Sequence, residues 1–241
     1  MSQFVKRSAL KAFILSLASF GSLAMTATES HAVQVDFSSW QKFGDVTTPG
    51  TGQTSLSTNA LQDDDFPQPD ANFNFSGTPA GQARPFTSLQ NFLGVAPTAL
   101  DVGGAAFEGS AIKNTFNAEA GDVFRFNYNF LTNETSTSRL DYAFFLVNST
   151  VTKLADFTNA SNPSSPFTSE TGNNSFTYTF SAPGTYNVAL GVVDVNDYNN
   201  TSALRVSNAN LEPVPEPLTI LGSLTALGFG AGLRQRFRKQ A

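Results

Sequence analysis

The sequence predicts an all-β protein in which two antiparallel sheets pack as a sandwich of jelly-roll type. The prediction rests on apolar residues that alternate at period two, on turn residues between the alternating segments, and on the lack of long helical periodicity in residues 33–213. Phe is frequent, with 23 among 241 residues, and most in the central segment occupy alternating positions. Short strands joined by such turns are typical of β-sandwiches.

Individual strands are predicted from the same alternation. In residues 122–130 four aromatic residues share one face and polar residues share the other. Residues 176–180 and 186–192 repeat the pattern, and residues 204–206 indicate a last strand. The run 142–147 is apolar throughout, which predicts a central strand covered on both faces.

Turn-forming residues separate these segments at 120–122, 162–166 and 181–184. Residues 45–90 give little strand signal, because Thr, Gly, Pro and Asp dominate them. We expect long loops there, with one or two short strands packed on the sandwich. The sandwich domain as a whole is expected to occupy residues 33–213.

The first 32 residues predict a secretory signal peptide. A start with three basic residues precedes an apolar run and then a small-x-small site. Ser30 and Ala32 fill the −3 and −1 positions, which places cleavage after Ala32. An amphipathic core helix is disfavoured because the run is apolar on all sides.

Residues 214–241 have the composition of a membrane tail. Pro215, Glu216 and Pro217 precede an uncharged segment rich in Leu and Gly, which is somewhat shorter than the roughly 20 residues that span a bilayer. A basic group that would hold the end in the cytoplasm closes the chain: Arg234, Arg236, Arg238 and Lys239.

The Pro-Glu-Pro motif, the apolar helix and the basic end occur in this order, and together they resemble the PEP-CTERM sorting tail. The resemblance implies cleavage at Pro215-Glu216-Pro217 by an exosortase-type membrane protease, and cells that often make an exopolysaccharide. It also implies an inner-membrane intermediate before the cell envelope or extracellular matrix, and leaves open whether the mature protein is anchored or released. Residues 108–211 resemble a β-sandwich domain of unassigned function found in other proteins with this tail.

Composition excludes several classes of function. Residues 33–213 contain seven Lys and Arg against 17 Asp and Glu, a balance that cannot neutralise nucleic-acid phosphates. The chain has no Cys, and its one His, His31, lies in the signal segment. A mature domain without His or Cys supports neither a serine triad nor a zinc centre.

Glycoside hydrolysis needs only two carboxylates, and the central segment has several. A surface with 17 acidic residues offers such pairs by chance, so we expect no enzyme activity. The carboxylates that could serve are Glu108, Glu119, Glu134, Asp141 and Glu170.

Calcium is a more natural use of these oxygens, because it accepts six to eight mixed oxygen ligands. Asp194, Asn196 and Asp197 follow a strand closely and are the predicted ligands, although their spacing is not that of an EF-hand. A solvated Asx-rich turn is the alternative. Residues 63–65 and Asp70 form a second acidic cluster, interpreted as an exposed loop.

Carbohydrate-binding sandwiches stack sugars on exposed aromatic rings. Trp40 is the only Trp and is one candidate platform, with a core position as its alternative. Tyr198 lies in the polar loop after a strand and is the second candidate.

The function expected from these observations is that of a non-catalytic surface or matrix protein that associates with exopolysaccharide. A lectin-like module with a defined sugar site is the alternative, followed by a carbohydrate-active enzyme. An ice-binding surface ranks last, because no regular Thr-x-Thr array is present.

Overall fold

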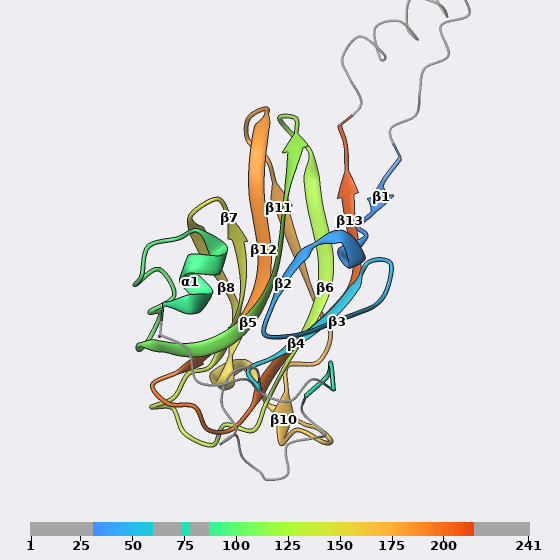
Figure 1. Ribbon diagram of the computed structural model, residues 1–241. Helices are drawn as coiled ribbons and strands as arrows, with labels where there is room; N and C mark the ends of the chain where they lie inside the picture. The colour runs from blue at the N-terminus through green and yellow to red at the C-terminus, as the bar shows by residue number, and fades with distance from the viewer. Residues whose placement is uncertain (1–30, 60–73, 78–86, 215–241) are drawn as a thin grey trace, which may run out of the picture. The chain divides into compact units, whose positions relative to one another are not determined.

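The computed structural model describes residues 31–59, 74–77 and 87–214. They form two antiparallel sheets packed face to face, as predicted (Figure 1). The apolar run of the signal peptide, predicted to be helical, the apolar helix of the tail, the sorting motif, the basic end and the acidic residues 63–65 and Asp70 lie outside the described residues.

Sheet A has eight strands in the order β3-β4-β13-β6-β10-β9, with β1 beside β13 and β11 beside β6. Its strands are β1 (Val33–Gln34), β3 (Asp45–Gly50), β4 (Gln53–Ser57), β6 (Val123–Thr132), β9 (Asn162–Pro163), β10 (Ser169–Glu170), β11 (Asn174–Thr179) and β13 (Ser202–Glu212).

Sheet B has five strands in the order β2-β5-β12-β7-β8. Its strands are β2 (Gln41–Phe43), β5 (Ala106–Ala118), β7 (Tyr142–Val147), β8 (Thr150–Asp156) and β12 (Gly184–Val195). Among the described residues, the helical segments are α1 (Ser88–Leu93) and two single 3-10 turns, η1 (Phe37–Ser39) and η3 (Phe157–Asn159).

The main core lies between the sheets and is built from the predicted alternation. Phe124, Phe126 and Phe130 of β6 are completely buried, and they pack with Phe145 and Leu190 of sheet B in one apolar cluster. Burying an aromatic or aliphatic side chain of this size stabilises the fold by about 1.5–3 kcal/mol. The periodicity read in residues 122–130 is therefore the pattern that joins the two sheets.

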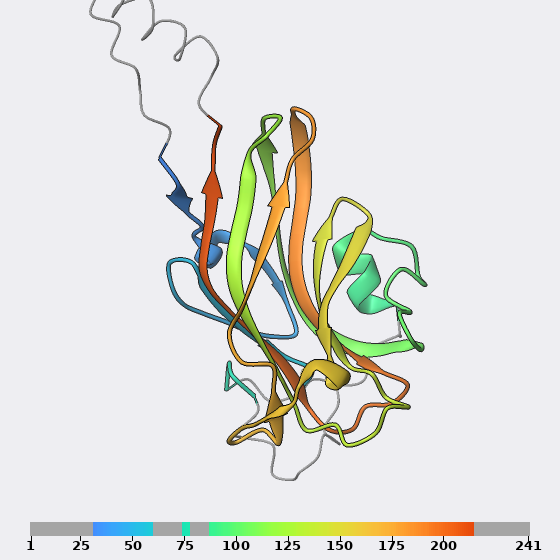
Figure 2. The ribbon, with the colours of Figure 1, turned by 180° about the vertical axis from the view of Figure 1, so that it is seen from behind.

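A second core covers the other face of sheet B. Every residue of β7 is buried, and its side chains alternate between the inter-sheet core and a cluster that includes Leu89, Leu93 and Leu100. α1 and the segment after it cover this outer face (Figure 2). The expectation of a strand buried on both faces is confirmed for residues 142–147.

The segment 45–57 forms a hairpin of two strands that belongs to sheet A. Residue Ala203 of β13 pairs with Ser57 of β4, and Asp45 of β3 pairs with Ser57 from the other side. The sequence allowed one or two short strands here, but placed them on the sandwich as an appendage. Their pairing with β13 makes them part of the sheet instead.

Within the described ranges, no helix is long and apolar enough to cross a membrane.

Candidate functional site

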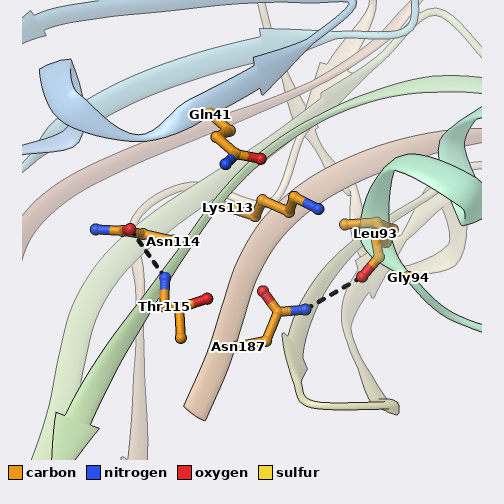
Figure 3. A pocket seen from close by; sticks show the side chains of 7 residues that line it. All are labelled: Gln41, Leu93, Gly94, Lys113, Asn114, Thr115 and Asn187. Atoms are coloured by element: carbon orange, nitrogen blue, oxygen red, sulfur yellow. Dashed lines mark hydrogen bonds between the residues drawn. The ribbon is translucent and has the colours of Figure 1, made fainter. Parts of the chain in front are cut away.

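A polar pocket of about 360 Å³ opens on the outer face of sheet B, where the cover given by α1 ends (Figure 3). Three strands and the end of α1 contribute to it. We call it the polar pocket, and its lining residues are Gln41, Leu93, Gly94, Lys113, Asn114, Thr115 and Asn187.

Strand register brings the polar side chains of the pocket together. Gln41 of β2 pairs with Lys113 of β5, and Thr115 of β5 pairs with Asn187 of β12. Directly paired residues point to the same face of a sheet. Lys113 and Asn187 alternate with buried residues of the inter-sheet core, so their own side chains face outward.

The end of α1 forms one wall of the pocket. Gly94 terminates the helix in the left-handed conformation, with φ 76°, which Gly adopts without steric cost. The carbonyl of Leu93 accepts a hydrogen bond of 3.1 Å from Asn187 Nδ2, and Lys113 Nζ donates to the carbonyl of Phe92. These two bonds satisfy carbonyls that a helix end leaves without partners.

Several polar groups of the pocket remain available to a ligand. Asn114 Oδ1 accepts from the Thr115 N–H at 2.9 Å (Figure 3). The Thr115 hydroxyl and the Gln41 amide form no hydrogen bond with any part of the chain that the structure describes. The Asn114 side chain points away from Lys113 and Asn187 (Figure 3). Gln41 and Thr115 are exposed, so donors and acceptors are both open to solvent.

The polar surface continues past the pocket along the same two strands. Asn117 and Thr185 pair directly and are exposed, and the Thr185 hydroxyl donates to Asn117 Oδ1 at 2.7 Å. Beside the pocket they form a neutral strip of one amide and one hydroxyl. Such groups match the hydroxyls of a sugar polymer.

Trp40 is not an exposed platform. Only 6% of its surface is accessible, and its ring packs against Phe37 at 4.9 Å and Phe124 at 6.4 Å between centroids. A face committed to the core cannot also stack on a sugar ring. The core position, which the sequence left as the alternative, is the one observed.

Tyr198 is half-buried in the loop after β12. Its ring meets Phe107 edge to face, with 5.1 Å between centroids. Neither residue lines the polar pocket. The two predicted aromatic platforms are thus not brought together with the polar residues of that pocket.

The three predicted calcium ligands serve different contacts. Asn196 uses both ends of its amide, because its oxygen accepts from the Ala105 N–H and its nitrogen donates to the Ser138 carbonyl, each at 3.0 Å. Asp197 pairs with Arg139 at 2.5 Å, and Asp194 is completely buried in β12. Among the described residues, no group of three or more His, Cys, Asp or Glu is arranged to hold a metal ion.

The structure gathers some of the predicted carboxylates in another way. Glu134 and Asp141 are buried, and the charge of Asp197 acts on both of them. We call Glu134, Asp141 and Asp197 the carboxyl cluster. Of the other candidates, Glu108 is buried, Glu119 is exposed and Glu170 is half-buried.

Burial changes the acidity of this cluster. Burial, with the nearby charge of Asp197, raises the pKa of Glu134 to about 6. Burial also raises the pKa of Asp141 well above its ordinary range, although hydrogen bonds from Ser202 and the Val195 N–H oppose the shift. Arg139 is the cation that faces the group. Glu134 and Asp141 therefore tend to hold protons, which is the behaviour expected of buried carboxyls that share a small space.

No model of a known protein family matches the chain, and no curated protein matches it.

Sequence reasoning missed every polar residue of the pocket. Lys113, Thr115 and Asn117 occupy alternate positions of β5, with Ile112, Phe116 and Ala118 between and around them and only Asn114 breaking the apolar face, a pattern that could have indicated an exposed polar face. The position of α1 and the register between β5 and β12 could not be predicted from such a local sequence pattern. These two features turn an ordinary polar strand face into a pocket.

Proposed function

We propose that this protein is an exported, non-catalytic surface or matrix protein that binds extracellular polysaccharide through the polar pocket. The single observation that carries the proposal is the pocket itself, where an open amide and a hydroxyl face solvent beside a continuing neutral strip. The signal-like start and the PEP-CTERM-like tail support export and processing by an exosortase-type protease. Absence of His and Cys from residues 33–241 supports a non-catalytic role.

The finer fold that we propose is a jelly roll. The strand paths β4-β13-β6-β11 and β5-β12-β7-β8 support it, because eight strands divided between two sheets in this order form two Greek keys. Lectin domains are among the proteins built on this architecture. Fold alone does not decide function, so the pocket carries the argument.

Polar contacts predict weak binding at each pocket. A hydrogen bond exchanged against water contributes only about 0.5–1.5 kcal/mol, and no aromatic platform adds stacking there. Many copies on one polymer chain raise the overall avidity without any new contact. This favours a matrix protein over a lectin with a tight small-sugar site.

The test compares two pairs of substitutions in the exported protein recovered from cells that produce it. Gln41→Ala with Thr115→Val removes open groups of the pocket and is expected to weaken co-sedimentation with exopolysaccharide of those cells about tenfold. Gln53→Ala with Thr177→Val is the matched control, because both residues are exposed on strands of sheet A. Equal binding by the two doubly substituted proteins would refute the site.

The lectin alternative makes a different demand. A defined small-sugar site predicts saturable binding of an oligosaccharide, and Tyr198 is the aromatic residue still open to such a role. Isothermal titration with short fragments of the polymer distinguishes the two. Saturation by a short fragment, lost in Tyr198→Ala, would favour the lectin.

A further inference from the structure

Lys113 is the one charged side chain that lines the polar pocket. The rest of the lining consists of two amides from Asn, one from Gln, a Thr hydroxyl and the end of α1. This occurs in a central segment with 17 acidic and seven basic residues. A cation that forms no ion pair with any carboxylate among the described residues is therefore contrary to the general charge of the domain.

Three of the other basic residues that the structure describes are paired with carboxylates, whereas Lys42 bonds the Thr48 hydroxyl and Arg205 lies over the Phe75 ring. Arg139 pairs with Asp197 at 2.5 Å, and Lys153 pairs with Asp156 at 2.5 Å. Arg125 lies 3.6 Å from Glu212. Lys113 instead donates to the Phe92 carbonyl and lies over the Phe92 ring, 4.6 Å from its centroid. Neither contact neutralises its charge.

The ammonium group is held in place and still has donors to offer. It carries three N–H groups, of which the Phe92 carbonyl takes one. The ring below restricts its position further. A fixed cation at the wall of an open pocket is ready to meet an anion without first losing much side-chain freedom.

We infer that the polar pocket selects sugars that carry a negative group, a carboxylate or a sulfate ester, and that Lys113 is the residue that selects them. The inference rests on the proposed function and names its ligand class. The anion meets Lys113, while Gln41 and Thr115 bond the sugar hydroxyls. A charge-assisted bond is about twice as strong as a neutral one, so the acidic group dominates selection.

The experiment measures three polymers on the exported protein recovered from cells: polyglucuronate, the same polymer after reduction of its carboxyl groups, and dextran sulfate. We expect the wild-type protein to bind polyglucuronate about tenfold more tightly than the reduced polymer at low salt, since added salt screens the attraction. Lys113→Gln should remove this difference, and Lys113→Arg should restore it. A preference for dextran sulfate that Lys113→Gln removes supports the inference and assigns the anion to a sulfate ester.

Lys42→Gln is the matched control for net charge. Lys42 lies next to Gln41 on the same strand, is exposed, and donates to Thr48 on sheet A at 3.0 Å. The Lys42→Gln substitution removes one charge without touching the pocket. The preference of this variant for polyglucuronate over the reduced polymer should therefore equal that of the wild-type protein.

The remaining outcomes overturn the inference in distinguishable ways. If Lys113→Gln weakens all three polymers equally, Lys113 only supports the end of α1 and selects nothing. If the wild-type protein binds all three equally and Gln41→Ala with Thr115→Val abolishes this binding, the proposed function stands and the anion selection fails. If the wild-type protein binds none of them and no native exopolysaccharide, both fail.

Discussion

The two ends of the sandwich interior are built from opposite chemistry. At the aromatic end, where β6 and β12 begin, rings such as Phe116, Phe180 and Tyr186 pack with centroids 4.6–5.8 Å apart. At the carboxyl end, where the same strands finish, the interior contains the buried carboxyls Asp141 and Asp194. In Figure 1 the first end lies at the top and the second at the bottom.

This difference teaches where stability and where pH sensitivity reside. Apolar packing is non-directional and independent of pH, so the aromatic end stabilises the fold under all conditions. Buried carboxyls depend on hydrogen bonds and on protonation. Asp45, also at the carboxyl end, shows the hydrogen bonds: its oxygens accept from the Ser57 hydroxyl at 2.5 Å and from the N–H groups of Phe75 and Ser76 at 2.7 Å.

The largest effect is expected from a cavity at the aromatic end. Phe145 is 1% exposed and contacts the rings of Phe124, Phe126 and Phe176. Phe145→Ala should lower the free energy of unfolding by about 3–5 kcal/mol, measured by urea denaturation. Val33→Ala, at a side chain that is 61% exposed, should leave it nearly unchanged. A loss below 1 kcal/mol for Phe145→Ala would mean that this end does not carry the stability.

The next largest effect is expected at the carboxyl end. There the raised pKa of Glu134 should make the free energy of unfolding fall as the pH rises. Because the pKa of Glu134 is about 6 when folded and 4.5 ordinarily, the folded state holds the proton more tightly than the unfolded state. Its contribution to stability is present below pH 4.5 and is lost as the pH rises through 6. A shift of this size corresponds to about 2 kcal/mol.

Glu134→Gln removes this titration and should raise the free energy of unfolding at pH 7.5 by up to about 2 kcal/mol. The substitution should also flatten the dependence of the free energy of unfolding on pH between pH 4.5 and 6. Urea denaturation across a pH series measures this dependence. Asp141 keeps its own raised pKa, so some slope remains. Glu119→Gln, at an exposed position, is the control. An unchanged slope in Glu134→Gln would contradict the assignment.

The smallest effect tests a neutral hydrogen bond at the carboxyl end. The Ser110 hydroxyl donates to the Ser57 carbonyl at 2.6 Å and accepts from the Asp45 N–H at 2.8 Å. Ser110→Ala should cost about 1–2 kcal/mol, because two buried backbone groups lose their partner. The same urea titration measures it. A change as large as that of Phe145→Ala would erase the distinction between the two ends.

The aromatic end was largely predictable from the sequence, whereas the carboxyl end was not. The alternation of residues 122–130 is a local pattern that identifies the buried face of the strand. Any apolar surface can cover the rings of that face, so no knowledge of distant residues is needed to predict their burial. The cluster joins Glu134 and Asp141, from the connection between β6 and β7, to Asp197, from the distant loop after β12. Their approach depends on register and loop paths, which local patterns do not contain.

The polar pocket escaped prediction for a related reason. Lys113 and Thr115 look like ordinary exposed residues of a strand, and Asn187 lies more than 70 positions away. Only the pairing of β5 with β12 and the end of α1 at Gly94 create the pocket. Trp40, a rare residue that attracts notice in a sequence, is part of the core.

The path of β13 has a mechanical consequence for the anchored protein that we propose. β13 leads from Ser202 to Glu212 between β6 and the pair β4 and β1, and the next residues carry on into the tail. Val33 pairs with Leu211, so both chain ends leave the sandwich at one pole. A force transmitted along β13 from a tethered tail would load the hydrogen bonds between β13 and its neighbouring strands in shear, so that all of them resist together. A force applied across the strand would break these bonds one after another. A domain held by an internal strand of its larger sheet resists drag on a bound polymer better than one held by an edge.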